Sequence, residues 1–249
     1  MNAAQDYRLS HTTPGKGIEY SESFQNLPYL RNLWEWEKKT LKQILDQNFA
    51  APQSINHLDF ACGTGRIIGY LEPMVGKSMG VDVSDAMLEV CRRAVQKSEL
   101  VKVDLTKNNI LKGAKFDLIT AFRFFLNAQA SLRDEVLQVL TNSLSPEGCF
   151  VFNVHMNKTS LHALITRLKF RITRRSEPFN SLSIDEVTKM VAKHGLQVQD
   201  IYHYGLLPVK VKSLSLPINI IDRIETPASR TKILKYFSSQ LIFVCKRSA

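Results

Sequence analysis

The sequence predicts an α/β fold in which a mostly parallel sheet is flanked by helices. Apolar runs of strand length recur along the chain, and stretches with helical periodicity lie between them. Such alternation is typical of βαβ units, whose crossover helices leave successive strands parallel. The hydrophobic fraction of 44% and the charged fraction of 22% suit a globular domain with a sizeable core.

Seven apolar runs are expected to form the strands of this sheet. They are residues 55–60, 79–83, 100–103, 116–122, 149–154, 196–203 and 240–246. All are short enough to be strands, and helical patterns separate most of them.

Helices are expected in the connections between these runs. Residues 30–47 carry an amphipathic pattern, and residues 84–97 begin with Ser84 as an N-cap. Residues 132–144 place apolar side chains at helical spacing, and Ser145-Pro146-Glu147-Gly148 is expected to stop that helix.

The two ends of the chain follow less regular patterns. The first twenty or so residues are expected to be flexible until a ligand binds. Ser183 and Glu186 form a capping-box pattern that opens a helix, and Gly195 is expected to end it. A short helix is expected near residues 230–236 in an otherwise irregular segment.

Charge and cysteine content narrow the classes of function. The formal net charge of +10 favours acidic partners, which include nucleic acid, an anionic lipid surface and a phosphorylated small molecule. The four cysteines form no C-x-x-C pair and lie in apolar segments, so we expect reduced thiols and no metal site. No signal-peptide core or bilayer-length apolar run is visible, which predicts a cytoplasmic protein.

A small-residue loop follows the first predicted strand and carries the clearest chemical pattern. The stretch reads Asp59-Phe60-Ala61-Cys62-Gly63-Thr64-Gly65 and leads into a helix. Gly63 and Gly65 remove side-chain bulk where backbone would approach a ligand, and Asp59 offers a carboxylate to a cationic or hydroxylated group. The G-x-G-x-x-G spacing of dinucleotide sites and the Gly-Lys-Ser/Thr of P-loops are both absent.

Acidic residues at the next two strand ends extend this site. Asp82 ends the second predicted strand, where a carboxylate can accept both hydroxyls of a ribose. Asp104 follows the third, where it can accept a hydrogen bond from an adenine amino group while Leu105 lies against the ring. Three aspartates at one sheet edge describe a site for an adenosine joined to a positively charged group.

With these residues, the sequence resembles the class I S-adenosylmethionine-dependent methyltransferase family over roughly residues 55–154. Asp59-Phe60-Ala61-Cys62-Gly63-Thr64-Gly65 looks like the first family motif and Val81-Asp82-Val83-Ser84-Asp85-Ala86-Met87-Leu88 like the second. Asp104-Leu105 is similar to the third and Phe116-Asp117-Leu118-Ile119-Thr120-Ala121 to the fourth. The resemblance implies a Rossmann-like seven-stranded sheet with an antiparallel last strand and S-adenosyl-L-methionine as cofactor.

The resemblance also assigns cofactor contacts. Asp59 is expected near the methionine amino group, and Asp82 is expected on the ribose. The remaining expected cofactor residues are Ala61, Gly63, Thr64, Gly65, Val83, Met87, Asp104, Leu105, Ala121 and Phe122. The whole chain, residues 1–249, is then one methyltransferase domain. Its parts are an N-terminal lid and helix (1–50), a cofactor-binding core (55–155) and two substrate-side insertions (157–178 and 206–239).

Three further residues are candidates for chemistry at the reacting end. His155, directly after the fifth strand, is a candidate general base, although a lone histidine is often only structural. Arg123 follows the fourth motif, where many small-molecule members carry histidines, and it can hold an anionic substrate group or form a structural ion pair. Arg31 can meet the methionine carboxylate or lie on a solvated helix face.

The methyl acceptor remains open at this point. The leading hypothesis is a small molecule that is methylated on oxygen or nitrogen. A sugar, a glycan precursor or a natural-product intermediate would fit, and anionic molecules are included. The basic amphipathic stretch 161–175 leaves a lipid substrate and peripheral membrane contact open, or it is a solvated surface helix. A nucleic-acid partner is disfavoured because no binding module is visible, and a catalytically silent cofactor binder is the alternative of another class.

Overall fold

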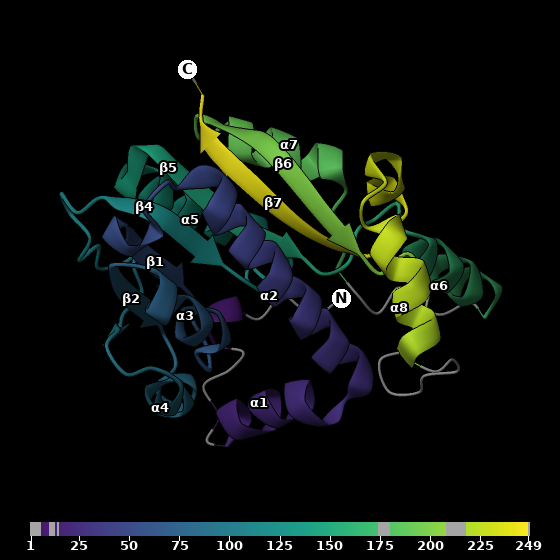
Figure 1. Ribbon diagram of the computed structural model, residues 1–249, viewed down its shortest axis with the longest axis horizontal. Helices are drawn as coiled ribbons and strands as arrows, with labels where there is room; N and C mark the ends of the chain where they lie inside the picture. Colours follow the sequence, from purple (N-terminus) through teal and green to yellow (C-terminus); the bar gives the residue numbers. More distant parts are fainter. Residues whose placement is uncertain (1–5, 10–12, 14, 174–179, 208–217, 249) are drawn as a thin grey trace.

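A computed structural model describes residues 6–9, 13, 15–173, 180–207 and 218–248, coloured along the chain in Figure 1. The strands are β1 Asn56–Phe60, β2 Lys77–Asp82, β3 Glu99–Lys102, β4 Phe116–Ala121, β5 Leu144–Val154, β6 Leu196–Tyr204 and β7 Gln240–Arg247. The α-helices are α1 Lys16–Asn26, α2 Pro28–Asn48, α3 Arg66–Leu71, α4 Asp85–Ala94, α5 Ala130–Ser143, α6 Leu161–Ile172, α7 Ile184–Ala192 and α8 Ile218–Ala228. Short 3₁₀ turns are η1 Tyr7–Leu9, η2 Pro52–Ser54, η3 Glu72–Met74 and η4 Lys232–Tyr236.

The strands form one seven-stranded sheet in the order β3-β2-β1-β4-β5-β7-β6. The pairs among β1 to β5 are all parallel, whereas β7 runs antiparallel to both β5 and β6. The predicted Rossmann-like sheet with an antiparallel last strand is therefore confirmed. Because the order reverses between β1 and β4, a crevice opens at their carboxyl ends.

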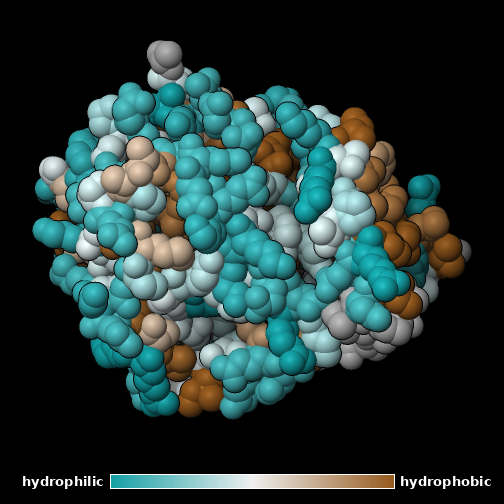
Figure 2. Space-filling model, in the orientation of Figure 1, coloured by the Kyte–Doolittle hydropathy of each residue, from teal (hydrophilic) through white to brown (hydrophobic). Residues whose placement is uncertain are grey.

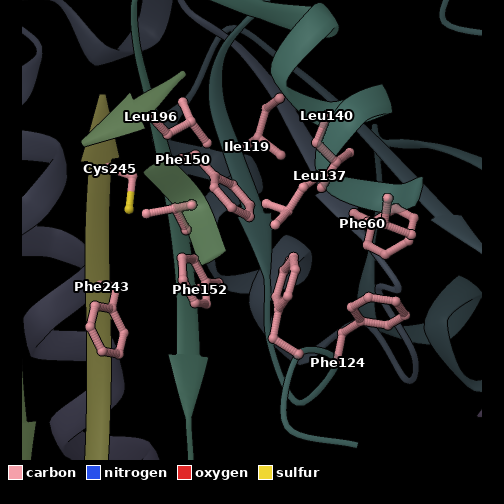
Figure 3. Packing of buried hydrophobic residues seen from close by; sticks show 14 of the residues in the cluster. Phe60, Ile119, Phe124, Leu137, Leu140, Phe150, Phe152, Leu196, Phe243 and Cys245 are labelled. Atoms are coloured by element: carbon pink, nitrogen blue, oxygen red, sulfur yellow. The ribbon is translucent and has the colours of Figure 1, made fainter. Parts of the chain in front are cut away.

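Helices cover both faces of the sheet, which is why its central strands are apolar on both sides. Along β4, Leu118 packs with α2 and α3 while the next residue, Ile119, packs with α5 and α7. Figure 3 shows the second of these cores, where Phe150, Phe152 and Phe243 stack beneath the leucines of α5. Figure 1 shows α2 crossing over the opposite face.

The helix caps follow their sequence signals. The Ser84 side chain accepts a hydrogen bond from the Met87 backbone at the start of α4. Ser183 and Glu186 form both bonds of a capping box at α7, and Gly195 adopts a φ of 69° after it. These local hydrogen bonds depend on neighbouring residues alone, so the sequence could predict them.

Three local features differ from the expectations. The first residues include a regular helix, α1, which packs on α2 and α4; a Cβ on Gly17 would lie 2.4 Å from the Ala86 carbonyl oxygen. The helix before residues 145–148 stops as expected, at Ser143, but β5 begins at Leu144 instead of residue 149. α8 was not expected at all, although the expected short helix nearby is η4.

α8 is held by tertiary contacts that leave no local sequence signature. The buried Glu225 carboxylate accepts hydrogen bonds from the backbone N–H groups of Gly205, Leu206 and Leu207. Parts of both predicted insertions, including Arg174 and Arg175 of the basic stretch, lie outside the described residues. In the described ranges, no helix has the length and apolarity needed to cross a membrane.

Candidate active site

A cavity of about 280 Å³ lies at the carboxyl ends of β1 to β5. The strand order places Asp104, Asp82, Asp59, Arg123 and His155 along its edge in that sequence, from β3 to β5. A single water occupies roughly 30 Å³, so the cavity is large enough for an organic ligand. We call the part near Asp104 and Asp82 the β3–β2 side, and the part near Arg123 and His155 the β4–β5 side.

The β1–α3 loop lines the cavity and contains three residues in the left-handed region of the backbone. Ala61, Gly63 and Gly65 all have positive φ angles, of 53°, 56° and 83°. A Cβ on Gly65 would lie 2.7 Å from the Cys91 sulfur, so this glycine permits close packing of α3 on α4. A Cβ on Gly63 would meet nothing closer than 3.9 Å, so this glycine leaves open space for a ligand.

Asp82 joins this loop to the β2–α4 turn. One of its carboxylate oxygens accepts a hydrogen bond from the Gly63 backbone N–H at 2.9 Å, and the other accepts one from Ser84 N–H at 2.9 Å. A carboxylate oxygen can accept more than one hydrogen bond, and Asp82 also lines the cavity. Asp82 therefore supports the loop and lines the cavity.

Residues before α1 cross the β3–β2 side as a strap, formed by Tyr7 and Arg8 of η1. The Arg8 Nε lies 2.8 Å from an Asp104 carboxylate oxygen, and its Nη2 reaches Thr106 and Glu135. The Tyr7 hydroxyl donates to the Arg123 carbonyl oxygen at 3.1 Å, and burial raises the pKa of Tyr7 to about 12. The strap closes one wall of the cavity.

Asp59 ends a buried chain of hydrogen bonds beneath the cavity. The Thr120 hydroxyl donates to the Asp59 carboxylate at 2.6 Å, while His57 Nε2 lies 2.8 Å from that hydroxyl oxygen and His57 Nδ1 lies 2.7 Å from Ser78 Oγ. This order requires the proton of His57 to be on Nε2. Burial raises the pKa of Asp59 to about 7 and lowers that of His57 to about 3.

Arg123 has a strained backbone and a buried guanidinium. Its φ is 63°, and its backbone is fixed by a 2.6 Å bond to Asn153 Oδ1 and a 2.7 Å bond from Asn127 Nδ2. Among the described residues, its Nε and Nη2 have no hydrogen-bond partner, and the nearest carboxylate, on Glu37, is 4.0 Å from Nη2. The guanidinium carbon also lies 5.4 Å from the Phe24 ring centroid. Buried guanidinium nitrogens without hydrogen bonds are costly, so this group suits an anionic ligand.

Arg66 lies beside Arg123, but its guanidinium already has an ionic partner and two aromatic contacts. Its guanidinium pairs with the buried Glu37 and lies between two rings, 4.3 Å from the Phe24 centroid and 4.5 Å from the Trp34 centroid. Such stacking and ion pairing satisfy a planar guanidinium. Arg66 is thus a structural member of the cavity wall.

His155 completes the β4–β5 side. Its Nδ1 is buried and has no hydrogen-bond partner in the described part of the chain. Burial, with the positive charge of Arg123 nearby, lowers the pKa of His155 well below its usual value. The imidazole is therefore neutral at neutral pH, with one nitrogen able to accept a hydrogen bond or a proton.

Most of the residues that the sequence singled out line this cavity. They are Asp59, Ala61, Gly63, Thr64, Asp82, Val83, Met87, Asp104, Leu105, Phe122, Arg123 and His155. Three do not: Gly65 packs α3 on α4, Ala121 is buried within β4, and Arg31 is exposed on α2. The prediction that Arg31 reaches this site was wrong because it lies on the solvent face of its helix.

Sequence reasoning predicted an N-terminal lid but did not single out most of the residues that this segment and α3 contribute to the cavity wall. Tyr7, Arg8, Phe24 and Arg66 all line the cavity, yet none belongs to a strand-end motif. Arg66 directly follows the glycine loop, and that position was the one local signal available. Within the described ranges, no cluster of three or more His, Cys, Asp or Glu residues is arranged to hold a metal ion.

Comparison with known proteins agrees with this geometry. Residues 58–148 match a family model described as a methyltransferase domain. An uncharacterized protein of Rickettsia prowazekii is 26% identical over 148 residues, covering 57% of this chain and 51% of that protein. The chain thus matches about half the length of this curated relative.

Solved structures share the fold over most of the chain. Magnesium protoporphyrin IX methyltransferase from Synechocystis, solved with bound SAH, is 12% identical with a TM-score of 0.66 and coverage of 98% and 100% of the two chains. The N-methyltransferase NodS from Bradyrhizobium japonicum, in complex with S-adenosylhomocysteine, is 12% identical with a TM-score of 0.58 and 91% coverage of each. The domain match over residues 58–148 and the shared fold support the resemblance to the class I S-adenosylmethionine-dependent methyltransferase family.

Proposed function

We propose that the protein transfers a methyl group from S-adenosyl-L-methionine to an oxygen or nitrogen of a small, anionic molecule. The observation that carries the proposal is the pair of unsatisfied polar groups on the β4–β5 side: the Arg123 guanidinium and His155 Nδ1. They line the same cavity as the glycine loop and Asp82. An anion-binding group beside a neutral base suits an acceptor that must be held and deprotonated.

The residues of the cavity fit the proposed cofactor. Asp82 lines the cavity with a carboxylate, a group that accepts hydrogen bonds from ribose hydroxyls. Met87 and Val83 offer apolar surface to an adenine, and the space above Gly63 admits a chain that passes close to the backbone. Burial raises the pKa of the Asp59 carboxyl to about 7. A cation bound beside Asp59 would lower this pKa and favour the ionised carboxylate. S-adenosylmethionine supplies such positive charge and an activated methyl group.

His155 has the clearest task in the reaction. A hydroxyl acceptor must lose a proton as its new bond to carbon forms, and a protonated amine must lose one before it can attack. The unpartnered Nδ1 can take that proton. Because its pKa is lowered, the imidazole is unprotonated at physiological pH and can act as a proton acceptor. Arg123 would hold the acceptor's anionic group and so fix its orientation.

The first experiment is calorimetric titration with S-adenosylmethionine and S-adenosylhomocysteine, with NAD and ATP as controls. Binding of the two sulfur nucleosides alone is expected. Transfer of a labelled methyl group is then followed into a low-molecular-weight extract, a lipid extract, total RNA and lysate protein. Cofactor binding without transfer to any pool would support a catalytically silent binder and contradict the proposed enzyme.

A lipid or lipid-linked acceptor is a second candidate, because α6 carries exposed apolar side chains close after His155. It differs from the first candidate in the extract that receives the label. Transfer to the lipid extract alone would replace the soluble acceptor with a membrane one and leave the cofactor assignment unchanged.

A further inference from the structure

α6 carries its apolar side chains on the outside of the protein. Leu161, Leu164, Ile165, Leu168 and Ile172 recur at the spacing of one helical face. Their exposed fractions range from 37% at Leu161 to 73% at Ile172. A surface helix ordinarily turns such a stripe toward the core, yet the side chain buried in this helix is the small Ala163.

The helix is firmly attached in this orientation. The buried Asn157 side chain donates to the carbonyl oxygens of Lys235, Tyr236 and Ser238, and the Leu161 backbone N–H donates to Phe237 O at 3.0 Å. Ser160, also buried, caps the helix by accepting from Ala163 N. Outward placement of the stripe is thus part of the folded structure.

Neighbouring segments extend the same apolar surface. η4 and the residue that follows it, which these hydrogen bonds join to α6, expose Ile233, Tyr236 and Phe237. α8 leads directly into η4 and exposes Ile220 and Ile224. Figure 2 shows hydrophobic residues gathered at the end of the molecule where Figure 1 places α6 and α8. We call this surface the α6 end.

Basic residues flank the apolar stripe of α6. At about 100° per residue, Lys169 falls on one side of the stripe and Arg171 on the other. Both side chains are exposed, and α6 contains no aspartate or glutamate. An apolar centre flanked by cations is the arrangement of helices that lie in the interface of anionic membranes.

We propose that the α6 end docks on an anionic lipid surface, with the stripe inserted among the lipids and Lys169 and Arg171 at the headgroups. A second copy of this chain fits less well, because a symmetric contact through α6 would bring its cations together without acidic partners on that helix. The proposal goes beyond the methyl-transfer function and does not depend on it. The chain runs from β5 into α6, so docking would place the β4–β5 side of the cavity near the membrane.

The test is flotation of the full-length protein with vesicles of phosphatidylcholine alone or mixed with phosphatidylglycerol. We expect flotation with the anionic vesicles, reduced by high salt because headgroup attraction is screened. Leu168→Glu and, separately, Ile172→Glu should each weaken binding at least about tenfold by removing inserted apolar area and adding a negative charge. The double variant Lys169→Gln/Arg171→Gln should weaken binding about tenfold as well.

The control is Ile110→Glu, which makes the same charge change at an exposed isoleucine in the loop after β3. It should float like the unmodified protein, and circular dichroism melting should show all variants folded. Wild-type protein that stays in the soluble fraction with anionic vesicles would overturn the proposal. So would a dimer in light scattering that Leu168→Glu dissociates without any vesicle binding, since the partner would then be a second copy.

Discussion

The two sides of the cavity differ in how their polar groups are satisfied. On the β3–β2 side, Asp82 accepts two backbone hydrogen bonds. Arg8 Nε and Asp104 Oδ2, which have no hydrogen-bond partner among the described residues, form an ion pair with each other at 2.8 Å. On the β4–β5 side, Arg123 and His155 keep buried nitrogens without hydrogen-bond partners among the described residues. The first side is prearranged by the chain itself, whereas the second needs a ligand to complete it. Binding affinity should therefore depend on the first side and turnover on the second.

The largest expected effect is at His155. We predict that His155→Asn lowers methyl transfer by roughly 100- to 10,000-fold, the usual contribution of a general base, while affinity for S-adenosylhomocysteine changes less than about twofold. His162→Asn, in α6, is the matched control and should leave transfer unchanged. Since burial and Arg123 lower the pKa of His155 well below its usual value, wild-type transfer at saturating S-adenosylmethionine should not fall as pH drops from 8 to 6.5. Equal transfer by His155→Asn and wild type would remove the base assignment.

Asp82→Ala should have the largest effect on cofactor affinity. It removes charge-assisted acceptors worth roughly 1.5–3 kcal/mol each and frees Gly63 N–H, so calorimetry should show affinity reduced on the order of 100-fold. Asp85→Ala, a neighbouring exposed aspartate, is the control and should bind normally. Unchanged affinity in Asp82→Ala would contradict the ribose assignment.

Arg123→Met separates two roles for the unsatisfied guanidinium. If Arg123 holds the acceptor, label transfer should fall roughly 10- to 100-fold, with affinity for S-adenosylhomocysteine and for methylthioadenosine both retained. Arg31→Met is the control, since Arg31 is exposed and lies off the cavity. A loss of affinity for S-adenosylhomocysteine but not for methylthioadenosine, which lacks the amino-acid group, would assign Arg123 to the cofactor carboxylate instead.

Asp59, at the junction of the two sides, should make the affinity for S-adenosylmethionine depend on pH. Its pKa of about 7 means that binding a cation near it should release a proton around pH 7. Affinity for S-adenosylmethionine should rise with pH, up to about tenfold per unit below 7, and level off above. Calorimetry in two buffers of different ionisation enthalpy measures the proton release, and Asp59→Asn should abolish this component.

The raised pKa of Asp59 has the opposite effect on the stability of the protein without ligand, which should fall as pH rises. A carboxyl that holds its proton more tightly when folded makes unfolding more favourable as pH rises from about 4 to 7, because the unfolded state ionises first. Asp59→Asn should therefore flatten this decline in stability. An identical decline in both proteins would show that other groups cause it.

The smallest effect is expected at the strap. Arg8→Ala removes the 2.8 Å contact with Asp104, a pair whose side chains are 18% and 19% exposed. Partly exposed ion pairs contribute about 1 kcal/mol or less, so affinity for S-adenosylhomocysteine should fall at most about fivefold, through faster dissociation in stopped-flow measurements. Lys16→Ala, an exposed pair with Glu19, is the control. A loss as large as that of Asp82→Ala would make the strap a primary binding element.

The sequence predicted the sheet well because its signal is local and periodic. Burial on both faces made each central strand a continuous apolar run, and the loop after β1 needs small residues wherever it bends or approaches a ligand. Local capping patterns at Ser84 and Ser183 were equally visible. Such features depend on a few adjacent residues, so they can be found without knowledge of the fold.

Contacts between distant segments were not predictable in this way. α1 packs closely on α4 where Gly17 approaches Ala86. The Glu225 carboxylate of α8 accepts hydrogen bonds from the backbone of a loop near residue 205. The sequence analysis singled out Arg31 and not Arg66, yet Arg31 lies on the solvent side of α2 while Arg66 stacks between two aromatic rings at the cavity.

By itself, the sequence determined the order of strands and helices, the glycine loop and the three aspartates at the carboxyl edge, because each is encoded in short-range patterns. Only the tertiary structure decided which cations reach the cavity, that Arg123 and His155 share its β4–β5 side, and that the apolar stripe of α6 faces outward. Those outcomes depend on how residues far apart in the chain bury one another, which no local pattern records.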